Sequence, residues 1–145
     1  MPAEAEPPSV AGQEPISDLF WSVARRLRGL SKQALAPWDV APSHGRALAV
    51  LLSRGDLRLS ELSEHLHIAP RSTTEVVDAL VERGLAERRP DPEDRRAVLV
   101  RLTEHGRAVA TAIRAARATE AEAFFEVLDD GDRAALARIL RRLQA

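Results

Sequence analysis

The sequence predicts a mainly α-helical fold with a small β-hairpin, built as a single domain. Apolar residues recur at steps of three and four along most of the 145-residue chain, which indicates amphipathic helices. One helical pattern breaks at residues 67–69 and resumes at Pro70, so two short helices flank a turn. Beyond Gly84 the spacing changes to the alternation that is typical of β-strands. The length is that of one domain.

The N-terminal segment differs in composition from the rest of the chain. Residues 1–15 hold four prolines, small residues and acids, and we expect a disordered arm there. From Ile16 to about Leu35 the pattern predicts a long amphipathic helix with Ser17 as its N-cap. The apolar stripe of this helix consists of Ile16, Leu19, Phe20, Val23, Leu27 and Leu30.

A turn with two prolines separates this helix from the next one. Pro37 and Pro42 are poorly suited to a helix interior, so we expect the chain to turn between them. The following helix begins at Ala41 or Ser43 and ends at Gly55, since glycine often terminates a helix.

Two short helices come next, on either side of the break. Ser60 is an N-cap type of residue, and we expect it to cap the first of them. Pro70 suits the first turn of the second, where a missing N–H costs little. Gly84 can take the left-handed conformation that ends a helix. The buried stripes of the two helices are predicted to be Leu59, Leu62 and Leu66, and Thr73, Val76, Val77 and Leu80.

The outer face of the second short helix is polar at its N-terminal end. Arg71, Ser72, Thr74 and Glu75 lie off the apolar stripe. An arginine and short hydroxyl groups at the start of a helix suit the major groove and the phosphates of duplex DNA. The helix-turn-helix pattern therefore predicts an element that reads DNA.

Two β-like runs, residues 85–89 and 97–102, flank a charged turn. The turn spans residues 90–96 and ends in Arg95 and Arg96. A narrow minor groove attracts arginine because its negative potential is enhanced. The predicted fold class is thus mainly α with a small β-wing, a winged helix-turn-helix.

The C-terminal segment predicts two further helices. Thr103 is expected to cap a helix that runs to Phe125, and Asp129 to cap the last one. The apolar stripe of the last helix has no partner in the small central module, and neither does the stripe of the first. An intertwined homodimer built from both ends of the chain is the simplest solution. The stripe of the last helix is Leu136, Ile139, Leu140 and Leu143.

Two motifs carry a resemblance to a known family. The sequence DPEDRRAVLVRLT at residues 91–103, preceded by ALVERGL at residues 79–85, resembles the MarR family of winged-helix transcriptional regulators. The likeness extends over most of the chain from about Ile16 onward. It implies a short strand near Leu57 and Leu59 that packs against the wing.

The resemblance also implies a division of the chain. Residues 16–145 would form one MarR-type domain, with dimerisation helices at 16–36 and 104–145. The winged helix-turn-helix lobe would span residues 42–103. Two recognition helices of a homodimer would then enter successive major grooves of a pseudo-palindromic operator, about 10 bp apart.

The family motif assigns roles to the wing. Its Asp, here Asp94, orients the Arg two residues later, here Arg96, which enters the minor groove. The DNA-binding candidates that follow from the motif and the helix pattern are Pro70, Arg71, Ser72, Thr73, Thr74, Glu75, Asp94, Arg95 and Arg96.

Three positions depart from the family pattern. Ala69 stands where a serine often caps the recognition helix, and Glu75 and Ala79 stand where basic residues are common. The Glu75 carboxylate can accept a hydrogen bond from a cytosine amino group. It can equally pair with Arg71, four residues earlier on the helix. The operator sequence therefore cannot be transferred from relatives.

Composition narrows the class of protein. The formal net charge is −1 and the isoelectric point about 6.4, which argues mildly against a nucleic-acid binder. The charge is segregated, however: residues 83–101 hold six arginines against four acids, whereas residues 1–20 hold acids only. The chain has no cysteine, which excludes disulfides and thiol sensing. No signal peptide or membrane span is predicted, so we expect a cytoplasmic protein without a membrane partner.

The expected function is that of a repressor, and the resemblance implies release by a small, often aromatic, effector. The effector-site candidates are Trp21, Trp38, His44 and Arg46, although both tryptophans are also explained by packing at a dimer junction. No cofactor, metal or catalytic site is expected, because the four histidines are scattered and no phosphate-binding loop is present. An alternative function is a protein-interaction module that does not bind DNA, which the near-neutral charge and Glu75 favour.

Overall fold

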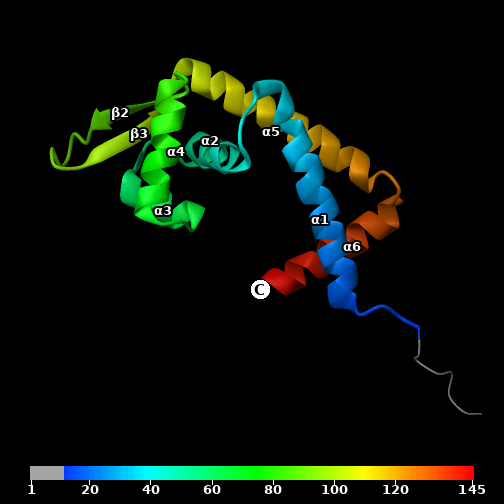
Figure 1. The fold of residues 1–145 in the computed structure, drawn as a ribbon. Coiled ribbons are helices and arrows are strands. Elements are labelled where there is room, and N and C mark those ends of the chain that lie inside the picture. The colour runs from blue at the N-terminus through cyan, green and yellow to red at the C-terminus, as the bar shows by residue number, and fades with distance from the viewer. Residues whose placement is uncertain (1–11) are drawn as a thin grey trace, which may run out of the picture.

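The computed structural model describes residues 12–145, and Figure 1 shows two parts joined by one long helix. Residues 1–11 of the predicted arm lie outside the described residues. α1 (Ile16–Ala34) packs along α5 (Glu104–Phe125) and forms an arm with α6 (Asp130–Gln144) at its far end. The other part is a compact lobe. It contains η1 (Ala36–Trp38), α2 (Pro42–Arg54), α3 (Leu59–Leu66), α4 (Pro70–Glu82) and a small sheet.

The sheet is antiparallel and has the strand order β1-β3-β2. The predicted hairpin is confirmed as β2 (Ala86–Pro90) and β3 (Val98–Leu102). The short strand implied by the resemblance is β1 (Leu57–Arg58), which pairs with β3 so that Leu57 lies opposite Val100. The wing is therefore attached to the lobe along its inner strand, and its turn projects away from the helices (Figure 1).

The hydrophobic core lies within the lobe and extends to the near end of α5. Every residue of the predicted α4 stripe is buried, and so are Leu62 and Leu66 of α3. By contrast, α6 contains no fully buried residue. No helix of the described part of the chain is long and apolar enough to cross a membrane. The largest fully buried side chains are Leu35, Leu48, Leu62, Leu80, Leu85, Val77, Val100 and Thr73.

The predicted helix ends are confirmed in part. The Thr103 and Asp129 side chains cap α5 and α6, and each accepts a backbone N–H three residues later. The caps predicted at Ser17 and Ser60 are wrong. Pro15 precedes α1 without a side-chain cap. α3 begins one residue before Ser60, at Leu59, where it continues directly from β1.

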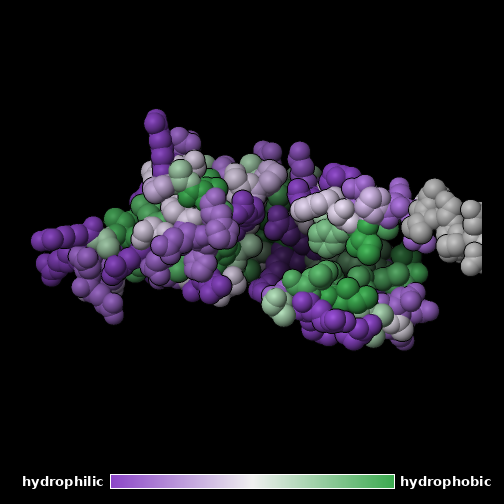
Figure 2. Space-filling view, turned by 90° about the horizontal axis from the view of Figure 1, so that it is seen from below, coloured by the Kyte–Doolittle hydropathy of each residue, from purple (hydrophilic) through white to green (hydrophobic). Residues whose placement is uncertain are grey.

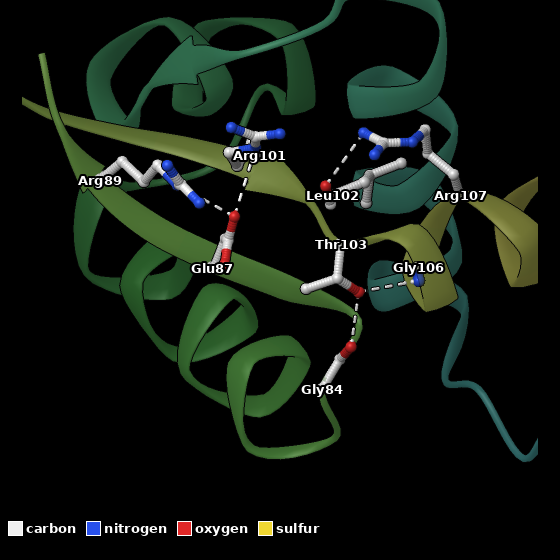
Figure 3. Close-up of polar contacts among 8 residues, drawn as sticks. All are labelled: Gly84, Glu87, Arg89, Arg101, Leu102, Thr103, Gly106 and Arg107. Atoms are coloured by element: carbon white, nitrogen blue, oxygen red, sulfur yellow. Dashed lines mark hydrogen bonds and ion pairs between the residues drawn. The ribbon is translucent and has the colours of Figure 1, made fainter. Parts of the chain in front are cut away.

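The end of α4 meets the start of α5 at a tight junction (Figure 3). Gly84 has a φ of 71°, which only glycine adopts readily, and its N–H closes the last turn of α4. The Thr103 hydroxyl donates to the Gly84 carbonyl at 2.6 Å and accepts from the Gly106 N–H at 2.9 Å. A Cβ atom at Gly106 would lie 1.8 Å from the carbonyl oxygen of Leu85. Hence only glycine permits this approach of α5 to the sheet.

We expect Gly106→Ala to destabilise the fold by about 3 kcal/mol, because backbone must move to accept the methyl group. Gly29→Ala is the matched control, since it makes the same chemical change within α1, where the new Cβ meets nothing within 4 Å beyond the neighbouring backbone of its own helix. The control should gain up to about 1 kcal/mol of helix propensity. Urea unfolding followed by circular dichroism, at one protein concentration, measures both. Equal stability of the two variants would contradict the close approach.

Candidate nucleic-acid interface

α4 presents a polar outer face at its N-terminal end. Pro70 begins the helix, and Arg71, Ser72, Thr74 and Glu75 are all exposed. The opposite face is anchored in the core, so these side chains are held toward solvent by the packing of the whole helix. Such a face, with one cation and two hydroxyls at a helix start, can bind phosphates and base edges.

Thr73 is a correction to the predicted interface. Its side chain is completely buried, although it was expected both on the core stripe and among the DNA contacts. Its hydroxyl donates to the Ala69 carbonyl at 3.2 Å and accepts from the Ser63 hydroxyl at 2.8 Å. Thr73 therefore fixes α4 against α3 and has no path to a ligand on the outer face.

The acid of α4 that pairs with an arginine is Asp78 and not Glu75. Within residues 12–145, Glu75 forms no ion pair with Arg71, so the suggested intrahelical pairing is absent. Asp78, one turn further along, instead pairs with Arg88 of β2. This contact ties the outer side of α4 to the base of the wing. Glu75 remains free to meet a hydrogen-bond donor.

The wing turn is held to the lobe by an ion pair that sequence reasoning missed. Arg58 of β1 approaches Asp91 with its Nε and Nη2 atoms 2.8 and 2.7 Å from Oδ2. The Asp91 Oδ1 atom accepts from the backbone N–H of Glu93 at 2.9 Å. This N–H and then the Arg58 guanidinium hold the pKa of the Asp91 carboxyl below its ordinary value, although its burial acts against them.

Asp94 contacts Arg96, the residue that the family motif says it orients, through the Arg96 backbone. Its Oδ1 atom accepts from the backbone N–H of Arg96 at 3.0 Å, and its carbonyl accepts from the Ala97 N–H at 2.9 Å. Asp94 thus shapes the backbone of the turn rather than gripping the Arg96 guanidinium. Arg95 and Arg96 are both exposed, and within the described residues neither forms an ion pair.

The outer face of the wing carries a second charged cluster, shown in Figure 3. Glu87 of β2 lies between Arg89 and Arg101, with its Oε1 atom 3.0 and 3.3 Å from their Nε atoms. Glu87 and Arg101 face each other across the two strands, which is the arrangement that favours opposite charges. These arginines are therefore partly neutralised, unlike those at the tip.

The structure does not bring the four effector-site candidates together. Trp21 is 54% exposed on α1, whereas Trp38 packs against the core. Arg46 donates to the Leu66 carbonyl at 2.6 Å and so caps the end of α3. Only His44 lines an open hollow, of about 600 Å³, together with Lys32 and Arg83. No group of acids and histidines within residues 12–145 is arranged to hold a metal ion.

Comparisons with known proteins agree with this geometry. The profile described as MarR family matches residues 41–98, which include α2, α3, α4 and the wing turn. The chain is 34% identical over 104 residues to "Uncharacterized HTH-type transcriptional regulator ML2140" of Mycobacterium leprae, and the alignment covers 70% of each chain.

Solved structures extend the likeness to the arm. A MarR family protein from Bacillus stearothermophilus superposes with a TM-score of 0.81 at 28% identity, over 89% of this chain and 90% of that one. A mutant MarR from E. coli, complexed with operator DNA, gives 0.75 at 25% identity, over 90% of this chain and 94% of that one. The fold, the interface geometry and these relatives together show that the chain is a member of the MarR family of winged-helix transcriptional regulators.

Proposed function

We propose that this protein is a homodimeric repressor that binds a pseudo-palindromic operator through α4 and the wing. The observation that carries the proposal is the outer face of α4, where Arg71, Ser72 and Thr74 are exposed beside a core-anchored stripe. The Arg58–Asp91 ion pair supports the wing as a second contact, because it holds the turn that bears Arg95 and Arg96. The operator complex of the E. coli relative supports the choice of partner.

The dimer is supported by apolar surface that one chain leaves uncovered. Figure 2 shows hydrophobic side chains gathered over the part of the molecule that α1 and α6 form. Ile16 is 85% exposed and Leu143 is 72% exposed, and large exposed apolar patches mark interaction surfaces. Trp21 is also exposed on α1, where its ring lies edge-on to the Phe20 ring. We therefore assign residues 16–36 and 104–145 to dimerisation, and residues 42–103 to DNA binding.

Release by a small effector remains part of the proposal. An effector would favour a dimer whose recognition helices are wrongly spaced, since a ligand shifts a population only through differential affinity. His44, in the open hollow between α1 and α2, is the one original candidate that the pocket geometry supports.

Arg96→Ala should weaken operator binding by about 1–3 kcal/mol, because it removes a free cation from the wing tip. Arg138→Ala is the matched control, since Arg138 is also exposed but lies on α6. Fluorescence anisotropy with duplex DNA from the region upstream of the protein's own gene, at two salt concentrations, measures both. Equal, small losses of operator affinity in the two variants would show that Arg96 does not contact the DNA.

The same titration separates the two candidate functions. A DNA-binding regulator should lose affinity steeply as salt rises, in proportion to the phosphates that it neutralises. If the first duplex fails, selection of bound fragments from the whole genome would search the remaining sites. No salt-dependent binding in either experiment would favour the protein-interaction alternative.

Asp91→Asn should lower operator affinity roughly threefold to tenfold, because the wing turn loses a charge-assisted bond to Arg58.

Since folding lowers the pKa of Asp91, the carboxylate stabilises the fold above its ordinary pKa of 3.8, and this contribution is lost as the pH falls below that value. The stability difference between wild type and variant should therefore be present at pH 6 and shrink below pH 4. Glu120→Gln, an exposed acid on α5, is the control. A pH-independent difference would exclude the ion pair as its cause.

The dimer is tested on α6. Ile139→Glu/Leu143→Glu should weaken association by at least about 3 kcal/mol, since two apolar side chains would each be replaced by a charge. The monomer fold should persist, because both side chains are exposed in one chain. Arg138→Glu changes the charge of the same helix without touching the stripe. Light scattering during size-exclusion chromatography would reject this interface if the double variant and the control had the same mass.

A further inference from the structure

Arg83 joins the end of α4 to the turn between α1 and α2. It is the C-cap residue of α4. Its Nη1 atom donates to the Asp39 carbonyl at 2.8 Å, and its Nη2 atom donates to the Trp38 carbonyl at 2.7 Å. The planar guanidinium thus bridges two successive carbonyls that lie 44 and 45 residues away in the sequence.

The turn that receives these bonds has an unusual backbone. Asp39 has a φ of 49°, in the left-handed region that residues with a side chain seldom adopt. Its N–H closes η1 by bonding to the Ala36 carbonyl. Among the hydrogen bonds of the described residues, Arg83 is the only donor to the Trp38 and Asp39 carbonyls. A cation at the carbonyl end of a helical turn is also favoured by its dipole.

The next residue fixes the same helix end from the other side. Gly84 presents its carbonyl to the Thr103 hydroxyl, which caps α5 (Figure 3). Arg83 and Gly84 therefore attach the end of α4 at two points, one at the turn that follows η1 and one at the start of α5. Because α1 packs against both α5 and η1, the two attachments lie where the chain passes between the arm and the lobe.

We propose that Arg83 is a positioning residue that sets the angle of the recognition helix and thereby the operator half-site spacing. This inference rests on the proposed DNA-binding dimer. In such a dimer the arm fixes the two protomers, and the angle of each α4 fixes the distance between the two reading faces. A protein with a defined angle should discriminate between operators that differ by one base pair in spacing. Loss of one attachment should reduce that discrimination.

The angle can be measured without DNA. The chain contains no cysteine, so Gln33→Cys/Glu75→Cys places one spin label on α1 and one on α4 with no background. Both positions are exposed. Labelled protein diluted into excess unlabelled chain reports the distance within one protomer. Pulsed electron–electron double resonance should give one narrow distribution of label-to-label distances for the wild type. Arg83→Ala should broaden that distribution. Arg54→Ala, an exposed arginine at the end of α2, should leave it unchanged.

The functional measurement uses three operators, with the natural spacing and with one base pair inserted or removed. Arg83→Ala should reduce the affinity ratio between natural and altered spacings by about tenfold, the equilibrium equivalent of one charge-assisted hydrogen bond. Arg83→Lys should also relax the ratio, because an ammonium group lacks the fork that spans two carbonyls. Arg54→Ala should keep the wild-type ratio.

The outcomes separate this inference from the proposed function. If the wild type binds no duplex, the proposed function fails, while the label distances still test the angle. An unchanged distance distribution in Arg83→Ala would overturn the positioning role, as would an unchanged spacing ratio in a wild type that discriminates. Loss of folding in both Arg83 variants would make Arg83 a stability residue and would also overturn it.

Discussion

The burial of one face of α4 is the constraint on which the interface depends. With Thr73, Val77 and Leu80 completely buried, the rotation of the helix about its axis is fixed by the core. The helical period then determines which residues face outward, and these include Arg71, Ser72 and Glu75. The wing, the junction with α5 and the Arg83 bridge orient an element whose outer face is already determined.

Local signals predicted most of the fold, whereas contacts between distant residues were missed. The α4 stripe, the Gly84 stop and the Thr103 cap depend on residues within one or two turns of each other, so spacing reveals them. Arg58 and Asp91 are 33 residues apart, and their pairing depends on how β1 lies beside β3. No periodicity encodes that contact. The Ser60 cap failed for a related reason, because pairing of β1 with β3 decides where α3 begins.

The near-neutral net charge does not show that the arginines fall into two groups, those paired with acids and those without an ion pair. Several are neutralised by acids that serve the structure: Arg88 by Asp78, Arg58 by Asp91, and Arg133 by Glu122. Others, such as Arg71 and Arg96, take no part in an ion pair within the described residues. Net charge counts both groups alike. What matters for recognition is the location of the unneutralised cations, which only the three-dimensional pairing reveals.

The N-terminus of α4 carries no side-chain cap, because Ala69 stands at the capping position. Pro70 has no N–H and the Thr73 N–H bonds to the Ala69 carbonyl, so within the described residues the N–H groups of Arg71 and Ser72 are the ones without an acceptor. A helix end of this kind attracts anions. A serine here would strengthen the free protein but would compete with a phosphate oxygen for the same donors. In the proposed complex, the missing hydroxyl would leave these N–H groups available to a phosphate oxygen, at some cost to the stability of the free helix.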